Sequence, residues 1–521
     1  MRSSTLIDSR SVPDAARRAG LGWLGVLVGI LLLAFALRAG GLLSESLWID
    51  EGYSLALAQT RALEIVRGTA ADQHPPLYYL LLGAWLRLGR PQLALQAIFL
   101  VRYLSVLIGT LGVAAGAWCG RELLGKEAGL ATALLLAVSP MHVWYSQEAR
   151  MYILLALLVT LSAGMVWRLV HGRRGWAVYG LVTVLALYTH YFAAFVIVAE
   201  NVLVLAWLVW VRVARQPVGT SRLGWPFYRR WLGVQAALGL CFSPWLPVAV
   251  YQTRYHQMRW LAPPRALQIA GTPLLMVLGD AGRGPVGVLA FVGLGLAVVW
   301  AICRERQAAD RRIQVTGYAF ALGWVLVPFG LVALLSLVFP LFQYKQMLML
   351  LTPLLAVIAA ALIRLPRPAQ VALAGALAWF VVGSLSGMVR VETKDGWREA
   401  GAYIEARFRP GDVLYLNPAA GRLGLDVYLV EPLPHEGYPP EYDVRTGGWE
   451  GEPVTAAVAE REMAALAGSY RRVWLVEFGP EFWDPDGHLR AWLQDHGRPG
   501  SQESFGRIVV TLYELDQERF P

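Results

Sequence analysis

Runs of about twenty apolar residues recur along this chain, and no other feature constrains its fold as strongly. An α-helix of that length is just long enough to cross the hydrocarbon core of a bilayer. Hydrophobic residues make up 56% of the 521 residues and charged residues only 16%, which excludes an ordinary soluble globule. The sequence therefore predicts a multi-pass α-helical membrane protein with about eleven transmembrane helices, over residues 21–43, 101–119, 128–144, 152–170, 176–190, 192–211, 231–251, 285–303, 315–338, 346–363 and 369–389.

Basic residues indicate how these helices are oriented, because loops rich in arginine and lysine stay on the cytoplasmic side of a membrane. Such loops alternate here, and they share one side with Arg17 and Arg18; they lie at 120–127, 171–175, 212–230, 304–312 and 364–367. The pattern predicts a plasma-membrane protein of the bacterial inner-membrane type, with a cytoplasmic N-terminus and a long first outer loop at 44–100. The apolar run 77–88 is short for a span and is expected to lie at the outer surface.

The last part of the chain differs in charge from the rest. Residues 390–521 contain 14 basic and 23 acidic residues, whereas the basic excess before them lies in short connections. That excess reports topology, so no nucleic-acid partner is expected. Stretches near 411–416, 473–477 and 507–513 have the composition of strands, and 395–404 has helical spacing. We therefore predict a transmembrane domain at 1–389 and a small extracytoplasmic α/β domain at 390–521.

Ionisable residues gather where the predicted spans meet the outer membrane surface. The adjacent acids Asp50 and Glu51 follow the first span, and an ionisable group at such a place indicates a functional site. Cations at this level can hold a phosphate while a carboxylate acts as a base, which suits an anionic amphiphile. The alternatives are helix-end anchors for the arginines and packing roles for the histidines. The further candidates are His74, Arg102, His142, Glu148, Arg150, His190, His256 and Lys345.

The order of these residues resembles a known family, the C-fold glycosyltransferases that use polyprenyl-phosphate sugars. This group contains protein O-mannosyltransferases and lipid A aminoarabinose transferases. The likeness covers about residues 20–390. Its motifs are Asp50-Glu51, His74-Pro75-Pro76-Leu77-Tyr78, Arg102-Tyr103-Leu104-Ser105, Ser139-Pro140-Met141-His142, Tyr145-Ser146-Gln147-Glu148-Ala149-Arg150-Met151-Tyr152 and Tyr188-Thr189-His190-Tyr191.

The resemblance implies a role for each matching residue. Asp50 corresponds to the catalytic carboxylate of the first outer loop, with Glu51 as its catalytic neighbour. The residues expected to bind the donor phosphate are His74, Arg102, Arg150 and Lys345. The residues expected to contact substrate are Tyr53, Glu148, Tyr152, His190 and Tyr344.

The implied reaction is an inverting transfer of a sugar from a polyprenyl-phosphate donor to a hydroxyl of a lipid, glycan or protein acceptor. Asp50 would take the proton of that hydroxyl, and the cations would stabilise the leaving phosphate. This scheme requires no cofactor; the acidic pair is compatible with a divalent ion, but no further acid cluster completes a metal site. Two alternatives stay open: transfer of a preassembled oligosaccharide from a lipid pyrophosphate, and non-enzymatic transport of a lipid or glycan.

Overall fold

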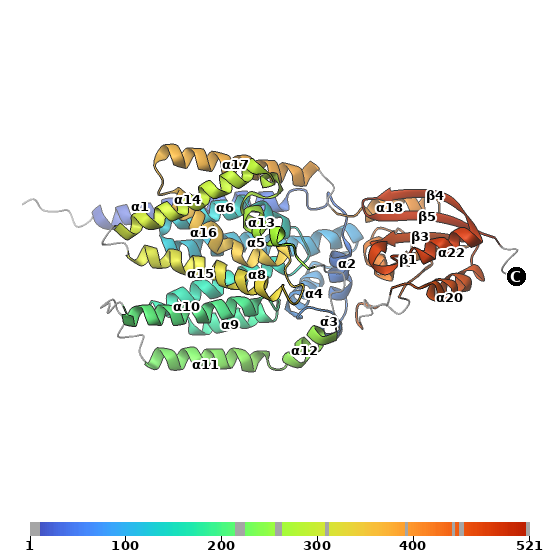
Figure 1. Ribbon diagram of the computed structural model, residues 1–521, viewed down its shortest axis with the longest axis horizontal. Helices are drawn as coiled ribbons and strands as arrows, with labels where there is room; N and C mark the ends of the chain where they lie inside the picture. The colour runs from blue at the N-terminus through green and yellow to red at the C-terminus, as the bar shows by residue number, and fades with distance from the viewer. Residues whose placement is uncertain are drawn as a thin grey trace, which may run out of the picture.

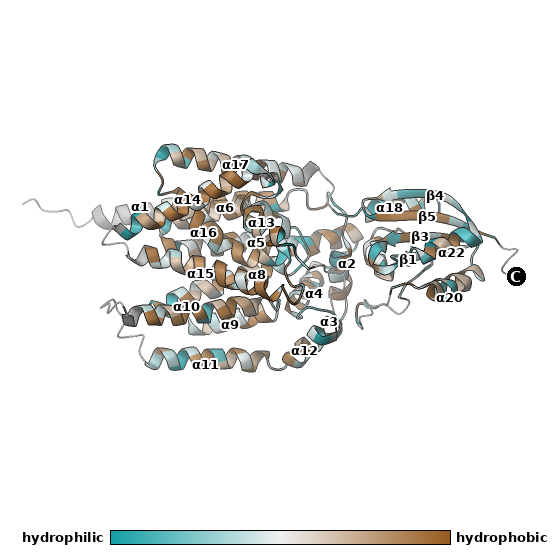
Figure 2. Cartoon of the chain, viewed as in Figure 1, coloured by the Kyte–Doolittle hydropathy of each residue, from teal (hydrophilic) through white to brown (hydrophobic). Residues whose placement is uncertain are grey.

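A bundle of long helices and a small α/β domain make up the computed structural model (Figure 1). It describes residues 11–213, 225–255, 263–307, 312–390, 394–439, 443–446 and 453–516. The α/β domain lies at one end of the bundle, beside the short helices α2 (Ile49–Ala58), α3 (Ala62–Ala71) and α4 (Leu77–Gly89). Figure 2 shows that hydrophobic residues dominate the long helices, whereas the α/β domain alternates between hydrophobic and hydrophilic residues.

Within the described residues, eight segments are long and apolar enough to cross a membrane. A ninth is the pair α11 (Trp225–Phe242) and α12 (Leu246–Tyr255), which bends by 67° at its break if it forms one span. Each of these segments coincides with a predicted span. The eight are α1 (Ser11–Ala39), α5 (Ala94–Leu124), α8 (Tyr152–Val170), α10 (Ala193–Val213), α14 (Pro285–Gln307), α15 (Arg312–Leu335), η3 (Tyr344–Leu350) continued by α16 (Leu351–Leu362), and α17 (Arg367–Arg390).

Two of the eleven predicted spans are helical but too short by this measure. The predicted span 128–144 is α6 (Lys126–Val138) followed by α7 (Pro140–Tyr145), and 176–190 contains α9 (Trp176–Leu187). The first break has a local cause. Ser139 is extended, and its side chain accepts a hydrogen bond from the backbone of His142, so that a new helix starts at Pro140.

Further short helices lie outside the candidate spans. The apolar run 77–88 forms α4, which has 13 residues and packs on α2 and α5, in keeping with the predicted position outside the spans. The predicted connection 252–284 contains the end of α12, and also α13 (Ala266–Leu278) and the turn η2 (Asp280–Gly282). Pro273 lies inside α13, where it cannot donate a backbone hydrogen bond to the preceding turn.

The α/β domain is built on a five-stranded sheet in the order β2-β1-β3-β5-β4. Strands β1 and β3 are parallel, and β5 runs antiparallel to β3 and β4. The predicted strands near 411–416, 473–477 and 507–513 coincide with β1, β3 and β5. The strands are β1 (Asp412–Asn417), β2 (His435–Gly437), β3 (Arg472–Phe478), β4 (Gly497–Phe505) and β5 (Ile508–Leu515).

Helices cover both faces of this sheet, so β1 and the interior of β3 are buried throughout. Successive side chains of a strand point to opposite faces. Val413 and Tyr415 therefore join the apolar cluster of one face, whereas Leu414 and Leu416 join that of the other. The helices of the domain are α18 (Trp397–Glu405), α19 (Arg422–Leu425), α20 (Ala456–Ala467), α21 (Pro480–Trp483) and α22 (His488–His496).

The predicted orientation can be tested by cysteine labelling. Arg174 lies in the exposed turn between α8 and α9, and Ser469 is exposed after α20 in the α/β domain. In a variant without Cys119, Cys241 and Cys303, we expect Ser469→Cys to react with an impermeant thiol reagent in right-side-out vesicles. Arg174→Cys should react only in inside-out vesicles. The reverse pattern, or equal labelling of both sites in both preparations, would contradict the orientation.

Candidate active site

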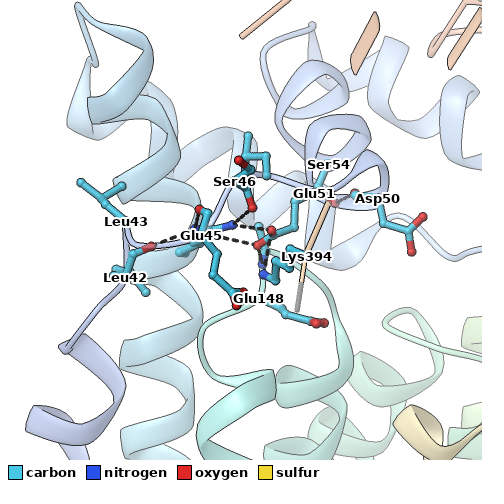
Figure 3. A network of polar contacts seen from close by, with 12 residues as sticks. Leu42, Leu43, Glu45, Ser46, Asp50, Glu51, Ser54, Glu148 and Lys394 are labelled. Carbon is cyan, nitrogen blue, oxygen red and sulfur yellow. Dashed lines mark hydrogen bonds and ion pairs between the residues drawn. The ribbon is translucent and has the colours of Figure 1, made fainter. Parts of the chain in front are cut away.

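Helix α2 places Asp50 and Glu51 in different surroundings although they are neighbours in the sequence. Trp48 has an extended backbone before the helix, and both acids lie in its first turn, where the helix dipole favours negative charge. Adjacent residues on a helix point about 100° apart. Figure 3 accordingly shows Asp50 directed away from Glu51 and from its hydrogen-bond partners.

Glu51 is the centre of a buried ion-pair network. Its side chain is 0% exposed. Arg102 contacts both carboxylate oxygens, at 3.0 and 2.7 Å, and the ammonium of Lys394 lies 2.9 Å from Oε2. The backbone N–H of Ala149 donates to Oε1 at 2.9 Å. Burial alone would raise the pKa of Glu51, but Arg102 and Lys394 outweigh it and lower the pKa to about 2. Glu51 is therefore ionised and fully engaged, which favours a positioning role over the predicted catalytic one.

Every hydrogen-bond donor of Arg102 binds either Glu51 or a backbone oxygen. A guanidinium has five N–H donors. Two go to Glu51. The other three go to backbone oxygens of the loop after α1, those of Leu42, Glu45 and Ser46, at 2.8–2.9 Å. With its side chain 2% exposed and every donor used, Arg102 has no contact left to offer a donor phosphate. The geometry thus favours a structural role for Arg102 over the predicted phosphate-binding role.

Asp50 lies in an open, positively charged environment. Its side chain is 31% exposed, with Arg150 Nη2 at 3.6 Å and Lys345 Nζ at 4.0 Å from Oδ2. Both distances exceed an ordinary hydrogen bond. In the part of the chain that the structure describes, neither carboxylate oxygen of Asp50 accepts a hydrogen bond. Asp50 is therefore a reachable carboxylate beside two cations, as expected for a base facing an anionic substrate.

The two cations are held by aromatic residues and by the backbone. Lys345 Nζ lies 5.8 Å from the ring centroid of Trp48 and 5.4 Å from that of Tyr152, and its side chain is 23% exposed. Arg150 donates to the hydroxyl of Tyr79 at 3.1 Å and to the backbone oxygen of Asp50 at 3.3 Å. A cation over aromatic faces keeps its charge while its free side remains available to a ligand, so Lys345 fits the predicted phosphate-binding role. The side chain of Arg150 is only 5% exposed, but its Nε has no partner among the described residues and remains available to a ligand.

The predicted histidines lie beside these cations, but they are neutral. The rings of His74 and His190 lie 5.5 Å apart, and the ring of His190 lies 6.0 Å from that of Tyr152. Burial lowers the pKa of His74 despite the carboxylate of Asp72 at 3.3 Å. Burial and the neighbouring His74 lower the pKa of His190 well below its ordinary value. At neutral pH both histidines can donate or accept hydrogen bonds to a ligand, but neither adds a positive charge.

Glu148 lies on the other side of Lys394 from Glu51 (Figure 3). Its Oε1 accepts a hydrogen bond from the indole of Trp144 at 2.8 Å, and its Oε2 has no partner among the described residues. Burial raises the pKa of Glu148 to about 7, although Lys394 acts in the opposite direction. Glu148 therefore changes its charge near neutral pH and can offer either an acceptor or a donor to a substrate hydroxyl.

Other predicted residues have roles in packing. Tyr53 is buried and packs edge-on against Tyr79, and the hydroxyl of Tyr344 donates to the backbone oxygen of Leu275. The ring Nδ1 of His142 accepts a hydrogen bond from the guanidinium of Arg38 at 2.9 Å, and both side chains are buried. His256 lies outside the described residues. In that described part, no group of three His, Cys, Asp or Glu side chains is placed to hold a metal ion.

Lys394 was not among the predicted site residues. It comes just after the last span and lies 343 positions from Glu51 in the sequence. Lys394 opens the stretch Lys394-Asp395-Gly396-Trp397-Arg398, which follows the last predicted span, 369–389. One signal could have singled it out: the chain contains only three lysines, Lys126, Lys345 and Lys394. Two of the three lie at this site.

Comparisons with known proteins give one family and one fold. The dolichyl-phosphate-mannose-protein mannosyltransferase family matches residues 73–246. ArnT from Cupriavidus metallidurans in the apo state is similar over 95% of this chain and 98% of its own, with a TM-score of 0.58 and 16% identity. The same protein bound to undecaprenyl phosphate is similar over 94% of this chain and 98% of its own, with a TM-score of 0.57 and 16% identity. The oligosaccharyltransferase of Archaeoglobus fulgidus is similar over 95% of this chain and 74% of its own, with a TM-score of 0.55 and 12% identity.

A comparison with curated protein sequences gave no match. The structural likenesses define the fold, which is that of the C-fold membrane glycosyltransferases. Together with the family match over residues 73–246, they confirm the resemblance predicted from the sequence, and the chain has the fold of these transferases.

Proposed function

We propose that the protein transfers a sugar from a polyprenyl-phosphate donor to an acceptor hydroxyl at the outer membrane surface, with inversion at the anomeric carbon. The observation that carries the proposal is the position of Asp50, an accessible carboxylate within 4.0 Å of both Arg150 and Lys345. The similar fold of ArnT bound to undecaprenyl phosphate supports the choice of lipid carrier.

In this reaction Asp50 accepts the proton of the acceptor hydroxyl. The oxygen of that hydroxyl forms a bond to the anomeric carbon as the bond from that carbon to the phosphate oxygen breaks. The electron pair of the broken bond leaves with the phosphate, whose growing negative charge Lys345 and Arg150 stabilise. A phosphate is a good leaving group, so the scheme needs neither a general acid nor a cofactor.

The spacing of the charges suits an inverting transfer. A phosphate oxygen about 2.8 Å beyond the ammonium of Lys345 would lie up to roughly 7 Å from the Asp50 carboxylate. Inverting glycoside hydrolases keep about 6.5–9.5 Å between their two carboxyl groups, which leaves room for the sugar carbon and its attacking nucleophile. This spacing leaves room for Asp50 to act as a base on the far side of the sugar from the phosphate.

The proposal can be tested with purified protein in liposomes. We expect release of polyprenyl phosphate from at least one member of a panel of synthetic polyprenyl-phosphate sugars, given a mixture of lipid, glycan and peptide acceptors. Consumption of only a lipid-pyrophosphate oligosaccharide would instead favour the oligosaccharide transferase. Movement of intact lipid-linked sugar across the bilayer without bond cleavage would favour a transporter.

The phosphate-binding role of Lys345 gives a separate prediction. We expect Lys345→Met to weaken donor binding and also to slow transfer at saturating donor, because the charge on the phosphate grows in the transition state. A lost hydrogen bond to a charged group costs about 1.5–3 kcal/mol, or roughly ten- to a hundredfold. Lys345→Arg should recover much of the loss, since it restores the positive charge. The measurements are donor affinity and single-turnover rate in the same membranes.

Lys126→Met provides the matched control, because Lys126 is the exposed first residue of α6 and follows the C-terminal end of α5, whereas Arg102 lies near the N-terminal end of α5. It should leave both quantities unchanged. Unchanged affinity and rate in Lys345→Met would mean that Lys345 only anchors the helix end, and Arg150 would then be the remaining cation for the phosphate.

A further inference from the structure

Consecutive residues of α2 contact the α/β domain on both sides of Asp50. Ile49 belongs to the apolar cluster of that domain, together with Trp397 and Ile404. Glu51 binds Lys394, and Gly52 packs against the backbone of Leu423. We call Ile49, Glu51, Gly52 and these partners the α2 contact. Asp50 is thus flanked by residues that the α/β domain holds in place.

The contact at Gly52 is made by backbone alone. A Cβ at position 52 would lie 2.2 Å from the carbonyl oxygen of Leu423 and 2.7 Å from its carbon. Real Cβ atoms do not come so close to backbone atoms, so only glycine allows α19 to approach this turn of α2. The α/β domain therefore lies directly against the helical turn that carries Asp50.

Lys394 is the charged part of the α2 contact. Its side chain is 8% exposed, its ammonium lies 2.9 Å from Glu51 Oε2, and it also lies 5.6 Å from the ring centroid of Trp144. Arg102 binds the same carboxylate from within the bundle. Glu51 is consequently held from two directions, once by a transmembrane helix and once by the segment that opens the α/β domain.

The loop before α2 is held by the same domain. The hydroxyl of Tyr428 accepts a hydrogen bond from the backbone N–H of Leu47 at 2.7 Å. Arg398 donates through its backbone N–H to Ser46 Oγ and through its guanidinium to the backbone oxygen of Leu43. Both the entry of the chain into α2 and the first turn of the helix are therefore fixed by contacts across the two domains.

We infer that the α/β domain is a working part of the active site, in which Lys394 acts through Glu51 as a positioning residue that sets the orientation of Asp50. The inference rests on the proposed function only in giving Asp50 the role of base. Reacting groups must lie within a fraction of an ångström of their productive positions, and a displacement of about 1 Å can cost roughly a hundredfold in rate. A cation that holds the neighbour of the base can therefore control the rate without touching the substrate.

The test uses the full chain with Lys394→Met, Lys394→Arg and the control Lys126→Met. Glu51 keeps its contacts with Arg102 and Ala149 in Lys394→Met, so the variant is expected to fold, with a smaller loss of stability than Arg102→Gln causes. We expect its transfer rate at saturating donor to fall roughly ten- to a hundredfold, with donor affinity unchanged. Lys394→Arg should recover most of the rate, and Lys126→Met should keep all of it.

A second measurement reports the orientation of residue 50 without any transfer. In a background without the three native cysteines, the rate at which Asp50→Cys reacts with a thiol reagent should change when Lys394→Met is added. It should not change with Lys126→Met.

If the wild type transfers sugar but Lys394→Met alters neither the transfer rate nor the labelling rate, the inference is wrong and the proposed function stands. If the wild type is inert with every donor while Lys394→Met still alters labelling, the proposed function fails and the positioning contact stands. If Lys394→Met slows transfer but also lowers the melting temperature strongly and weakens donor binding as much as it slows transfer, Lys394 has a purely structural role.

Discussion

Asp50→Asn is expected to abolish sugar transfer while the protein still folds and binds its donor. Asparagine has nearly the shape of aspartate but cannot accept the proton of the acceptor hydroxyl. Positioned general bases contribute about a hundredfold to ten-thousandfold, so the rate should fall at least about a hundredfold. Donor affinity should stay equal or rise, because Arg150 and Lys345 would no longer share their charge with the Asp50 carboxylate. The measurements are single-turnover rate and donor binding in liposomes.

Asp280→Asn is the matched control. Asp280 lies in η2 between the short helix α13 and α14, its side chain is 82% exposed, and it pairs with Arg283 and not with a residue of the site. The control should retain the wild-type rate. Near-normal turnover in Asp50→Asn would assign the base to another group, and Glu148, whose Oε2 has no partner among the described residues, would be the next candidate.

The membrane architecture could be predicted from the sequence because the bilayer imposes a simple rule of length and polarity. The predicted span 152–170 and the helix α8 have the same bounds. The rule failed where local side-chain bonds interrupt a helix. Ser139 and Pro140 end one helix and start another within the predicted span 128–144, and a hydropathy window averages over such a break.

The sequence could predict that the candidate residues lie close together, but not the contacts that distinguish one candidate from another. The sequence shows that Asp50 and Glu51 are adjacent and lie after the first span. It does not show that Glu51 binds Arg102, which is 51 residues away in the sequence, and Lys394, which is 343 residues away. Those long-range contacts decide which of the two acids remains free to act as a base.

Tertiary contacts also distinguish two cations to which the sequence analysis assigned the same role. Arg102 and Lys345 both lie at ends of predicted spans, so the sequence offered no reason to separate them. In the structure the side chain of Arg102 is 2% exposed and that of Lys345 is 23% exposed. Burial and donor count, which depend on the tertiary fold, distinguish a structural cation from one that can meet a ligand.

Arg102→Gln should therefore act mainly on stability. Removing one member of a buried ion pair leaves the other charge without compensation, at a cost of about 3–5 kcal/mol. Glu51→Gln should be at least as damaging, because it leaves both Arg102 and Lys394 buried without their carboxylate. The measurement is the thermal or denaturant unfolding of each variant in the same detergent, with Lys126→Met as the control.

Two further features of the unfolding data would identify the ion pair as the cause. The double variant with Glu51→Gln and Arg102→Gln should lose less stability than the sum of the single variants, because the two groups interact directly. The folded-state pKa of Glu51 is lowered from 4.5 to about 2, so its contribution is complete above about pH 4.5 and is lost as the pH falls towards 2. The stability difference between wild type and Glu51→Gln should shrink over that range.

If Arg102→Gln instead kept wild-type stability and weakened donor binding, Arg102 would be a phosphate ligand after all. Its contacts with Leu42, Glu45 and Ser46 would then have to exchange for the donor when it binds.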